Sequence, residues 1–529
     1  MDRRIVLGLA ILLATGSVSA QTFPTPEYWR GMAQRPRTAA QAAPPEGLRD
    51  SIVAGKLRLS LADVVRLTLA NNTEVRINQL DYQDSRFAID RAYQPFDPIF
   101  TAGFTTRRSS TPTTETTPGV ATQMSLNQST TASFAQQFFT GTRYTIDFRG
   151  GRNTTNSQVS RLNPALSSSV DFNITQPLLR NRGITPNKAP LIIARRNFEQ
   201  SRNTFHAQVQ DTLQQAINRY WDVVQARDNL IVLRKSLELA EATYALDKRK
   251  LELGALPPLD IYRSESQVAN RRVQVIQAEY QLKQQEDELR RVIGADLDFN
   301  IRALDLELVE TAEPKGELLT MDSQQAVEEA LKQRPELEAL RLRLQNDDTS
   351  IRVAHNGLQP DLSLAAFYSS SGLGGELGSA LEQLSGFDFP TYGFSLQLRL
   401  PIKNRVAAAE LGSAMVSQQR SLYTLRQREQ AVTLEARNAV HQLEQAKLSM
   451  AAARIAVDVA RKNLQAEERK YELGAQTIFF VLDAQTQLSQ AEQELLRAQI
   501  SYQRAVTAVN RATGALLERN NVQINDAIK

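Results

Sequence analysis

The sequence lacks cysteine altogether and contains only three histidines in 529 residues. Without a thiol, the chain has neither a disulfide nor thiolate chemistry. His206, His355 and His441 are far apart in the sequence and do not show the short ligand spacing of a metal site. Glycine-rich phosphate loops and the Gly-x-Ser-x-Gly nucleophile motif are also missing. We therefore expect no metal, no cofactor and no enzymatic activity.

A strong charge of either sign is missing as well. The formal net charge is +4 at pH 7, which is too small in a chain of this length to favour nucleic-acid binding. A long apolar stretch occurs only near the start, where Arg3 and Arg4 precede Ile5–Leu13 and the small residues Val18–Ala20. This order is typical of a cleaved signal peptide, with an uncleaved anchor as the alternative. If the remainder spans a membrane, it needs β-strands that close into a barrel.

The sequence contains an internal repeat. RKLELGALPPLDIYRSESQ (249–267) returns as RKYELGAQTIFFVLDAQTQ (469–487) after 220 residues, and Gly254 then aligns with Gly474. A repeat of units this long indicates two copies of one structural module. The resulting division is a signal peptide, an extended proline-rich leader, a first repeat, a second repeat and a C-terminal tail (1–20, 21–57, 58–310, 322–517 and 518–529).

Each repeat is predicted to contain a very long helix followed by a shorter one. Apolar residues recur at intervals of seven in the long helices, which indicates supercoiled packing, and about 67 residues at 1.5 Å each make a rod of roughly 100 Å. Gly254 and Gly474 end the long helices. An earlier helix opens each repeat, and Ser60 is the expected N-cap of the first. The ranges are 61–93, 186–253 and 259–293, then 323–357, 406–473 and 477–517.

Between the opening helix and the long helix, the pattern changes to a period of two. Apolar and polar residues alternate, for example over 142–150. This alternation predicts strands within 99–176 and 362–400, separated by polar loops. An additional alternating hairpin at about 130–150, turning at Gly141, has no counterpart in the second repeat. We interpret it as an elaboration of an outer-face loop, with an enlarged barrel as the alternative.

Two connecting segments complete the predicted order. The equatorial segment between the repeats, 296–310, alternates over 298–310 and is expected to form a short pair of strands there, midway along the helical rod. A glycine- and serine-rich loop is expected at 369–379, inside the strand region of the second repeat.

The duplicated order of helix, strands, very long helix, glycine turn and shorter helix resembles the TolC-like outer-membrane efflux protein family. The motifs that carry the resemblance are YELGAQTIFFVLDAQ (471–485), LELGALPPLDIYRSE (251–265), and Pro177 and Pro401, each of which follows a strand. The resemblance implies a mixed α and β fold with two internal repeats. In a homotrimer, about four strands per chain would form an outer-membrane β-barrel that a long periplasmic α-helical barrel continues.

The resemblance also implies a function. It indicates the outer-membrane channel of a tripartite efflux pump or type I secretion system in a Gram-negative bacterium, which passively conducts substrates to the exterior. The implied partners are a periplasmic adaptor (membrane fusion) protein, a proton-driven or ABC inner-membrane transporter and outer-membrane lipid. The competing hypothesis is a periplasmic or secreted structural coiled-coil protein without a pore. The cargo stays open among drugs, metal ions, glycolipids and secreted proteins.

The resemblance places the functional residues at the periplasmic tips. It implies adaptor contact at the two glycine turns, which comprise Leu253, Gly254, Ala255, Leu473, Gly474 and Ala475. The acidic ring that narrows the family's duct matches Asp483, and Asp260 matches the acid of the first tip. Phe479 and Phe480 are expected to supply part of the constriction, whereas Gln476 stands where the family has a latching arginine. The simpler interpretations are an ordinary turn for the glycines and a helix cap for Asp483.

Overall fold

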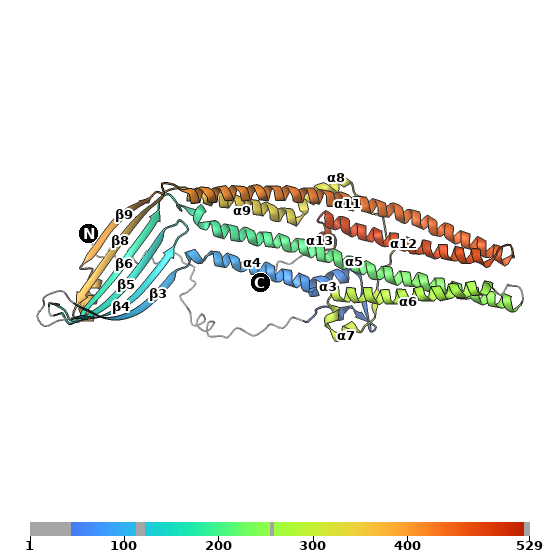
Figure 1. Cartoon of the computed structure of the whole chain (residues 1–529), viewed down its shortest axis with the longest axis horizontal. Helices are drawn as coiled ribbons and strands as arrows, with labels where there is room; N and C mark the ends of the chain where they lie inside the picture. Colours follow the sequence, from blue (N-terminus) through green and yellow to red (C-terminus); the bar gives the residue numbers. More distant parts are fainter. Residues whose placement is uncertain (1–43, 113–121, 158, 254–258, 523–529) are drawn as a thin grey trace. The chain divides into compact units, whose positions relative to one another are not determined.

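The computed structural model describes residues 44–112, 122–157, 159–253 and 259–522. The chain divides into two units, residues 1–45 and 46–529. The predicted signal peptide and most of the leader fall in the first unit and lie outside the described residues. The second unit combines long helices with one large sheet and one small sheet (Figure 1).

The end of the expected leader is folded. A 3₁₀ turn, η1 (Arg49–Ser51), is followed by β1 (Ile52–Val53) and β2 (Lys56–Leu59), which pair antiparallel. Strand β2 also pairs in parallel with β7 (Leu306–Leu308). Leu57 and Leu59 are completely buried in the main apolar core, and their burial holds this strand in place.

The predicted strand pair within 296–310 is wrong. That segment contains η3 (Ala295–Leu297), the short helix α7 (Phe299–Arg302) and the single strand β7. The partner of β7 is instead β2, where the leader meets the first repeat, about 250 residues earlier in the chain. Local alternation indicates that a segment suits a strand, but it carries no information about a partner this distant.

The opening helix of each repeat is broken into two. In the first repeat, α3 (Leu61–Asn71) begins with the predicted Ser60 cap, which forms a capping box with Asp63. Asn72 then caps α4 (Thr73–Ala92), and its side-chain amide donates to the Val292 carbonyl at 3.0 Å. In the second repeat, a proline begins α9 (Pro335–Gly357) directly after α8 (Ser323–Gln333).

The long helices are α5 (Ile184–Glu252) and α11 (Arg405–Glu472), and each packs beside a shorter one, α6 (Asp260–Val292) and α12 (Ile478–Ala512). A last short helix, α13 (Leu516–Arg519), follows α12. Residues spaced seven apart are buried along both long helices, because this spacing keeps them on one stripe. They are Val209, Ala216, Val223 and Leu230 in α5, and Ala436, Leu443, Met450, Val457 and Leu464 in α11.

The large sheet has six antiparallel strands in the order β3-β4-β5-β6-β8-β9. The first repeat contributes four of these strands and the second repeat contributes two. They are β3 (Ile99–Pro112), β4 (Thr122–Gln137), β5 (Arg143–Thr155), β6 (Ala165–Pro177), β8 (Asp361–Gly374) and β9 (Pro390–Arg399). The strand number therefore exceeds the four implied by the family resemblance.

The interpretation of the additional hairpin as an outer-face loop is wrong. Its two strands are β4 and β5, which lie inside the sheet between β3 and β6. Its turn approaches the start of α5: a Cβ at Gly141 would lie 2.6 Å from the Asn181 carbonyl oxygen, and the ammonium of Lys188 lies 4.1 Å from the ring centroid of Phe139. The hairpin therefore turns at the helical end of the sheet, opposite to the expected side.

The glycine- and serine-rich segment at 369–379 is not a loop either. Strand β8 continues to Gly374, and the helix α10 (Leu377–Gly386) begins soon afterwards. Ser168 donates to the Ala380 carbonyl at 2.8 Å, and a Cβ at Gly372 would lie 2.0 Å from the same oxygen. The small residues are required because α10 packs directly on β6 and β8.

Candidate functional site: the sheet wall and the helical tips

The large sheet has one apolar and one polar face. Register pairs align one apolar residue from every strand in a single row across the sheet: Phe100, Phe134, Ile146, Phe172, Tyr368 and Tyr392. The next row, on the opposite face, is entirely polar: Thr101, Ser133, Asp147, Asp171, Ser369 and Thr391. Alternation of this kind over six strands is typical of a wall between lipid and water.

The apolar face is exposed in the single chain, except where α10 packs on it at Ser168 and Gly372. Phe104, Phe394 and Leu398 are 65%, 79% and 62% exposed. Large apolar side chains in this number are costly to leave in water and favourable in lipid. No helix in the described ranges is both long and apolar enough to cross a membrane.

The polar face holds a network of charged and hydroxyl groups. Asp147 and Asp171 lie directly opposite each other on β5 and β6. Ser133 donates to Asp147 and Ser369 donates to Asp171, each at 2.5 Å, and the Arg149 guanidinium lies 3.0 Å from Asp171. These bonds offset the repulsion between the two carboxylates and keep this face hydrophilic.

The second helical tip closes through backbone geometry. Gly474 has a φ of 72°, the left-handed region that glycine adopts without strain. Its amide donates to the Tyr471 carbonyl at 3.1 Å, and the Ala475 amide donates to the Lys470 carbonyl at 2.9 Å, which is the Schellman arrangement. Leu473 is 72% exposed at this turn.

The first tip is described only up to its edge. Leu253, the last residue before the turn, is 82% exposed. The other two predicted contact residues there, Gly254 and Ala255, lie outside the described residues. Each tip therefore presents a bare leucine to solvent in the single chain.

The structure separates the predicted constriction residues into two places. Phe479 and Phe480 lie in the first turn of α12, about half exposed, with ring centroids 5.5 Å apart. Asp483 is exposed one turn later and accepts from the Gln487 amide at 2.6 Å. Because α12 begins at Ile478, Asp483 does not cap it, which excludes the simpler interpretation. Asp260 is the first residue of α6, on the other hairpin.

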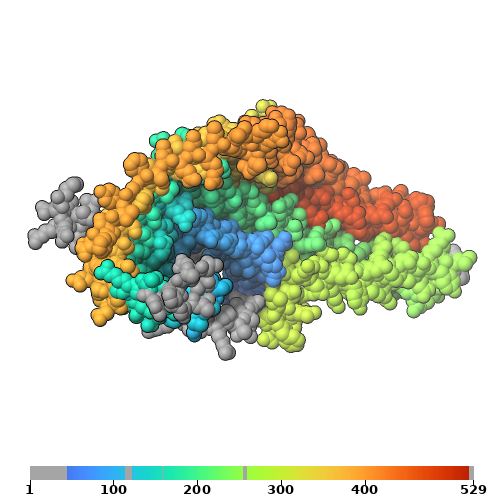
Figure 2. Space-filling view, turned by 60° about the vertical axis from the view of Figure 1, so that its left-hand side comes forward, coloured from blue at the N-terminus to red at the C-terminus, as the bar shows by residue number. Residues whose placement is uncertain are grey.

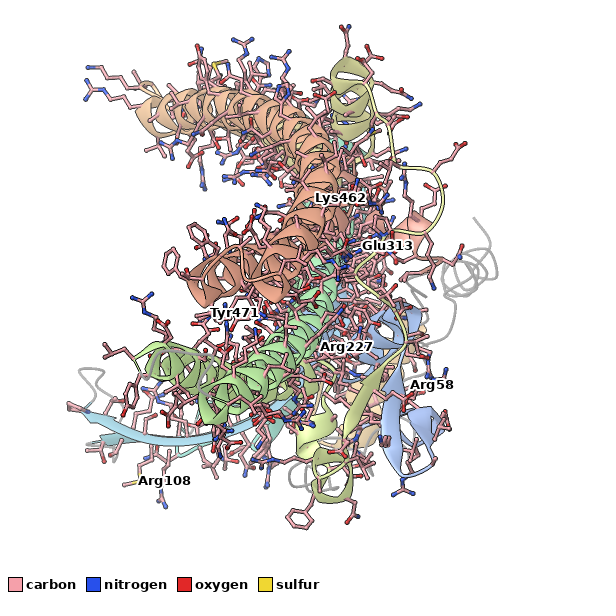
Figure 3. The ribbon with its side chains drawn as sticks, turned by 90° about the vertical axis from the view of Figure 1, so that its right-hand side faces the viewer. Arg58, Arg108, Arg227, Glu313, Lys462 and Tyr471 are labelled. Atoms are coloured by element: carbon pink, nitrogen blue, oxygen red, sulfur yellow. The ribbon has the colours of Figure 1, made fainter. Side chains whose placement is uncertain are left out.

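A buried carboxylate near the tips was missed by the sequence interpretation. Asp247 of α5 is completely buried, and it accepts hydrogen bonds from Ser264 of α6 and from the Tyr471 hydroxyl of α11, the latter at 2.6 Å. Burial, together with the hydrogen bond that its hydroxyl donates to Asp247, raises the pKa of Tyr471. Figure 3 shows Tyr471 where the α11–α12 hairpin approaches the α5–α6 hairpin. Asp247 follows Leu233 and Ala240 at the same spacing of seven, and all three are buried. A charged residue at a position of the buried stripe was the sequence signal that could have revealed this carboxylate.

Two further side-chain bonds join the hairpins at this level. Gln485 of α12 donates to Thr243 of α5 at 3.0 Å. The guanidinium of Arg271, on α6 and 5% exposed, donates to Thr486 of α12 at 2.9 Å. Buried polar links of this kind specify one arrangement of the two hairpins.

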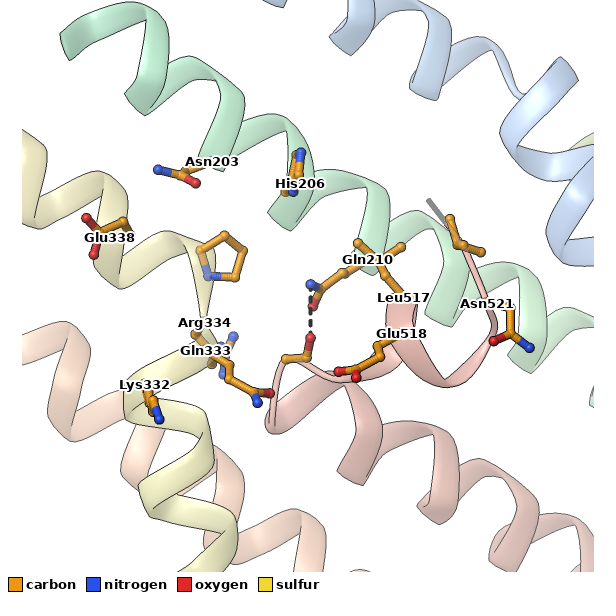
Figure 4. A pocket seen from close by; sticks show the side chains of 13 residues that line it. Asn203, His206, Gln210, Lys332, Gln333, Arg334, Glu338, Leu517, Glu518 and Asn521 are labelled. Carbon is orange, nitrogen blue, oxygen red and sulfur yellow. Dashed lines mark hydrogen bonds between the residues drawn. The ribbon is translucent and has the colours of Figure 1, made fainter. Parts of the chain in front are cut away.

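A cluster of charged residues lies where the two repeats meet, near the middle of the helices. Glu336 of α9 lies 2.8 Å from both Arg334 and Arg511, and Arg511 lies 2.6 Å from Asp211 of α5. Burial by itself would raise the pKa of Glu336, but the bonds to Arg334 and Arg511 hold it at about 2. A neighbouring pocket of about 630 Å³ is lined by Gln210 and Lys332 among others (Figure 4). Within this cluster, the ion pair between Arg511 and Asp211 joins the second repeat to the first.

The space-filling view shows the 46–529 unit hollowed between the orange segments of the second repeat and the teal and blue segments of the first (Figure 2). A sheet with one apolar and one polar face, combined with two long helical hairpins, defines a channel-forming outer-membrane protein of mixed α and β type. The sequence model of the outer membrane efflux protein family matches residues 145–295 and 326–515. The chain belongs to this family.

Individual relatives agree with this assignment. The chain is 23% identical over 391 residues to outer membrane protein TolC of Vibrio cholerae, a match that covers 73% of this chain and 85% of that protein. It is 25% identical over 298 residues to the pyoverdine export outer membrane protein OpmQ of Pseudomonas putida, which covers 56% of this chain and 60% of OpmQ. The chain therefore spans less than two thirds of the length of OpmQ.

Solved structures show the same fold. The crystal structure of CusC matches with a TM-score of 0.64 and 18% identity over 91% of this chain and 98% of CusC. The Campylobacter jejuni CmeC outer membrane channel matches with a TM-score of 0.63 and 15% identity over 88% of this chain and 90% of CmeC. The predictions of the family, of the mixed two-repeat fold and of an outer-membrane location are confirmed. The family consists of channel proteins, so the relatives support an efflux channel rather than an enzyme or a coiled coil without a pore.

Proposed function

We propose that three copies of the chain form one continuous water-filled duct, which serves as the passive exit channel of a tripartite efflux pump or a type I secretion system. The observation that carries this proposal is the two-faced sheet. Its apolar face suits outer-membrane lipid, and its polar face, with Asp147, Arg149 and Asp171, suits a wet lumen. The long helices then continue the duct into the periplasm.

A single copy does not complete this structure. Strands β3 and β9 have a sheet neighbour on one side only in the described part of the chain. Unpaired strand edges are not tolerated in lipid, because nothing there satisfies their backbone groups. Association of identical chains removes the edges and encloses the lumen.

The helical tips are the proposed contact for a periplasmic adaptor protein. Leu253 and Leu473 are exposed apolar residues beside turns, and a Cβ at Gly474 would meet no atom within 4 Å. Ala475 adds a small side chain to this proposed surface, and the sequence predicts the same contact role for Gly254 and Ala255, which lie outside the described residues. The adaptor would connect the duct to an inner-membrane transporter, proton-driven or ABC, which supplies the energy.

We place the constriction of the duct near the start of α12. A three-fold arrangement would bring together three copies of Asp483, and a ring of carboxylates attracts cations. Phe479 and Phe480, exposed one turn earlier, would narrow the same region. Asp260, at the start of α6, would contribute the acid of the first tip.

Two measurements test these proposals. The full-length protein should be recovered from the outer-membrane fraction as a heat-labile trimer that conducts ions in planar bilayers. A soluble monomer without conductance would contradict the proposed duct.

Asp483→Ala should lower cation selectivity severalfold in the same bilayer recordings, because the carboxylate ring would be lost. Asp458→Ala is the matched control, since Asp458 is an exposed acid of α11 that pairs with Lys462 and should leave selectivity unchanged. Equal selectivity in wild-type and Asp483→Ala channels would remove Asp483 from the constriction.

A further inference from the structure

The number of strands in the large sheet bears on the width of the duct in the membrane. We propose that the β4–β5 hairpin is part of the membrane wall, and that β9 of each copy pairs with β3 of the next. Three copies of a six-stranded sheet then close a barrel of eighteen strands, instead of the twelve implied by four strands per chain. This inference rests on the trimeric duct proposed above.

The hairpin has the same two faces as the rest of the sheet. Phe134 and Ile146 continue the apolar row between Phe100 and Phe172. On the polar face, Ser133 of β4 donates to Asp147 of β5. A hairpin that protruded from the wall into water would have no reason to carry an apolar face in register with its neighbours.

Pairing on both sides of the hairpin is long and regular. Strand β4 pairs with β3 from Ile99↔Ala135 to Pro112↔Thr122. Strand β5 pairs with β6 from Arg143↔Thr175 to Asn153↔Ala165. The hairpin is therefore held by backbone hydrogen bonds along nearly its full length.

The turn of the hairpin is anchored at the junction with the helices. The ring centroid of Phe139 lies 4.5 Å from that of Phe96, just before β3, and Lys188 of α5 lies over the same ring. A Cβ at Gly141 would clash with Pro177 and Asn181. These contacts fix the hairpin where a wall strand has to end.

Strand direction permits closure with a second copy of this chain. All neighbours in the sheet are antiparallel, so the first strand, β3, and the sixth, β9, run in opposite directions. A β3 strand from the next copy can therefore pair with β9 without a parallel junction. A second copy is the partner that fits, because it presents an exposed edge of matching two-faced pattern: every residue of β9 except Gly393 is exposed, and β3 is exposed except at Ser109.

The consequence is a duct that is widest in the membrane. Barrel diameter grows about linearly with strand number, so eighteen strands make a wall about half as wide again as twelve. Each chain still contributes only its two hairpins, α5–α6 and α11–α12, to the tips. Size selection then falls to the tips, near Phe479 and Phe480, and the outer-membrane section does not limit the cargo.

Disulfide cross-linking in the full-length protein tests the pairing. Because the chain has no cysteine, each cross-link reports only the introduced pair. Phe104→Cys is combined in turn with Tyr392→Cys, Phe394→Cys, Leu396→Cys and Leu398→Cys. At least one pair should yield covalent dimers and trimers in outer membranes. Ala132→Cys with Phe148→Cys, which are register partners, is the control and should cross-link only within one chain.

The opposite result is equally specific. If β4 and β5 were excluded from the wall, β3 would pair directly with β6. Phe104→Cys would then cross-link within one chain to a cysteine at 168, 170 or 172, and this outcome would overturn the inference.

A strand count by electron cryo-microscopy of the purified protein gives an independent reading, and eighteen strands are expected. Deletion of residues 122–164 removes β4 and β5 and leaves β3 antiparallel to β6, so this variant should show twelve. A conducting trimer of the full-length protein with twelve strands would refute the inference and leave the proposed function intact. Absence of any trimer would refute the proposed function itself.

Discussion

The two repeats agree in their long helices and differ in their strands. Helix α5 contains 69 residues and α11 contains 68. The first repeat contributes four strands to the sheet, whereas the second contributes two strands and the helix α10, which packs on β6 and β8. Both long helices run from the sheet to the helical tips, so similar lengths bring the two tips to the same level (Figure 1). A sheet can gain strands in antiparallel pairs without changing the direction of its edges.

The largest effect is expected in the buried charge cluster of the second repeat, which contacts the first repeat through Arg511 and Asp211. Glu336→Ala removes the carboxylate that the buried Arg334 and Arg511 share, while Arg334 keeps Glu435 and Arg511 keeps Asp211. The substitution should lower the free energy of unfolding by about 3 kcal/mol, which corresponds to the lowered pKa of Glu336. Chemical denaturation of the detergent-solubilised protein measures this loss. Glu338→Ala, on the same helix but half exposed, should cost less than about 0.5 kcal/mol. Equal effects of the two substitutions would show that Glu336 does not stabilise the buried cluster.

Because of the Glu336 carboxylate, we expect the stability of the folded protein to depend on pH. The pKa of Glu336 is lowered from 4.5 to about 2 in the folded protein. Its contribution is therefore present above about pH 4.5 and is lost as the pH falls toward 2, by up to about 3 kcal/mol. Thermal midpoints measured between pH 6 and pH 2 should fall less steeply in Glu336→Gln than in the wild type. Parallel curves would contradict this assignment.

The packing of α10, a helix of the second repeat, can be tested at Gly372. Gly372→Ala places a Cβ against the Ala380 carbonyl, which should displace α10 from the sheet and cost about 1–3 kcal/mol. Gly378→Ala, within α10 and with no atom within 4 Å of the new Cβ, is the control and should be neutral or slightly stabilising. Hydrogen exchange of α10 amides reports the displacement, and unchanged protection in Gly372→Ala would show that the close packing is unnecessary.

The smallest of these effects on stability is expected near the tips. Tyr471→Phe removes one of the two hydroxyl donors to buried Asp247 and should cost about 1–2 kcal/mol. The loss should appear as faster hydrogen exchange in the α5–α6 and α11–α12 hairpins near their tips. Tyr262→Phe removes a hydroxyl from an exposed position of α6 and should leave exchange unchanged. If both variants exchange alike, then Asp247 does not hold the hairpins together.

Some elements of the fold follow from local patterns. The capping box at Ser60 depends on residues three positions apart. The buried stripes of α5 and α11 depend on a repeat of seven, and the glycine at 474 marks a turn that needs a positive φ. Interactions of this range depend on residues close together in the sequence, so these features could be predicted from the sequence.

Other elements could not be predicted from local patterns. The pairing of β2 with β7, the place of β4 and β5 inside the sheet and the identity of α10 all depend on partners far away in the sequence. For the candidate site, the residue types at the tips were predictable, whereas the bond between Asp247 and Tyr471 joins positions 224 residues apart.

By itself, the sequence determined a duplicated unit of strands and long helices, and the order of these elements resembles the outer membrane efflux family. The reason is that periodicity, capping and glycine turns act over a few residues. The tertiary structure alone decided how many strands form the wall, which face each residue occupies and which buried charges join the repeats. These features depend on strand register and on side-chain packing between distant segments, where one shift of register exchanges the two faces of a strand.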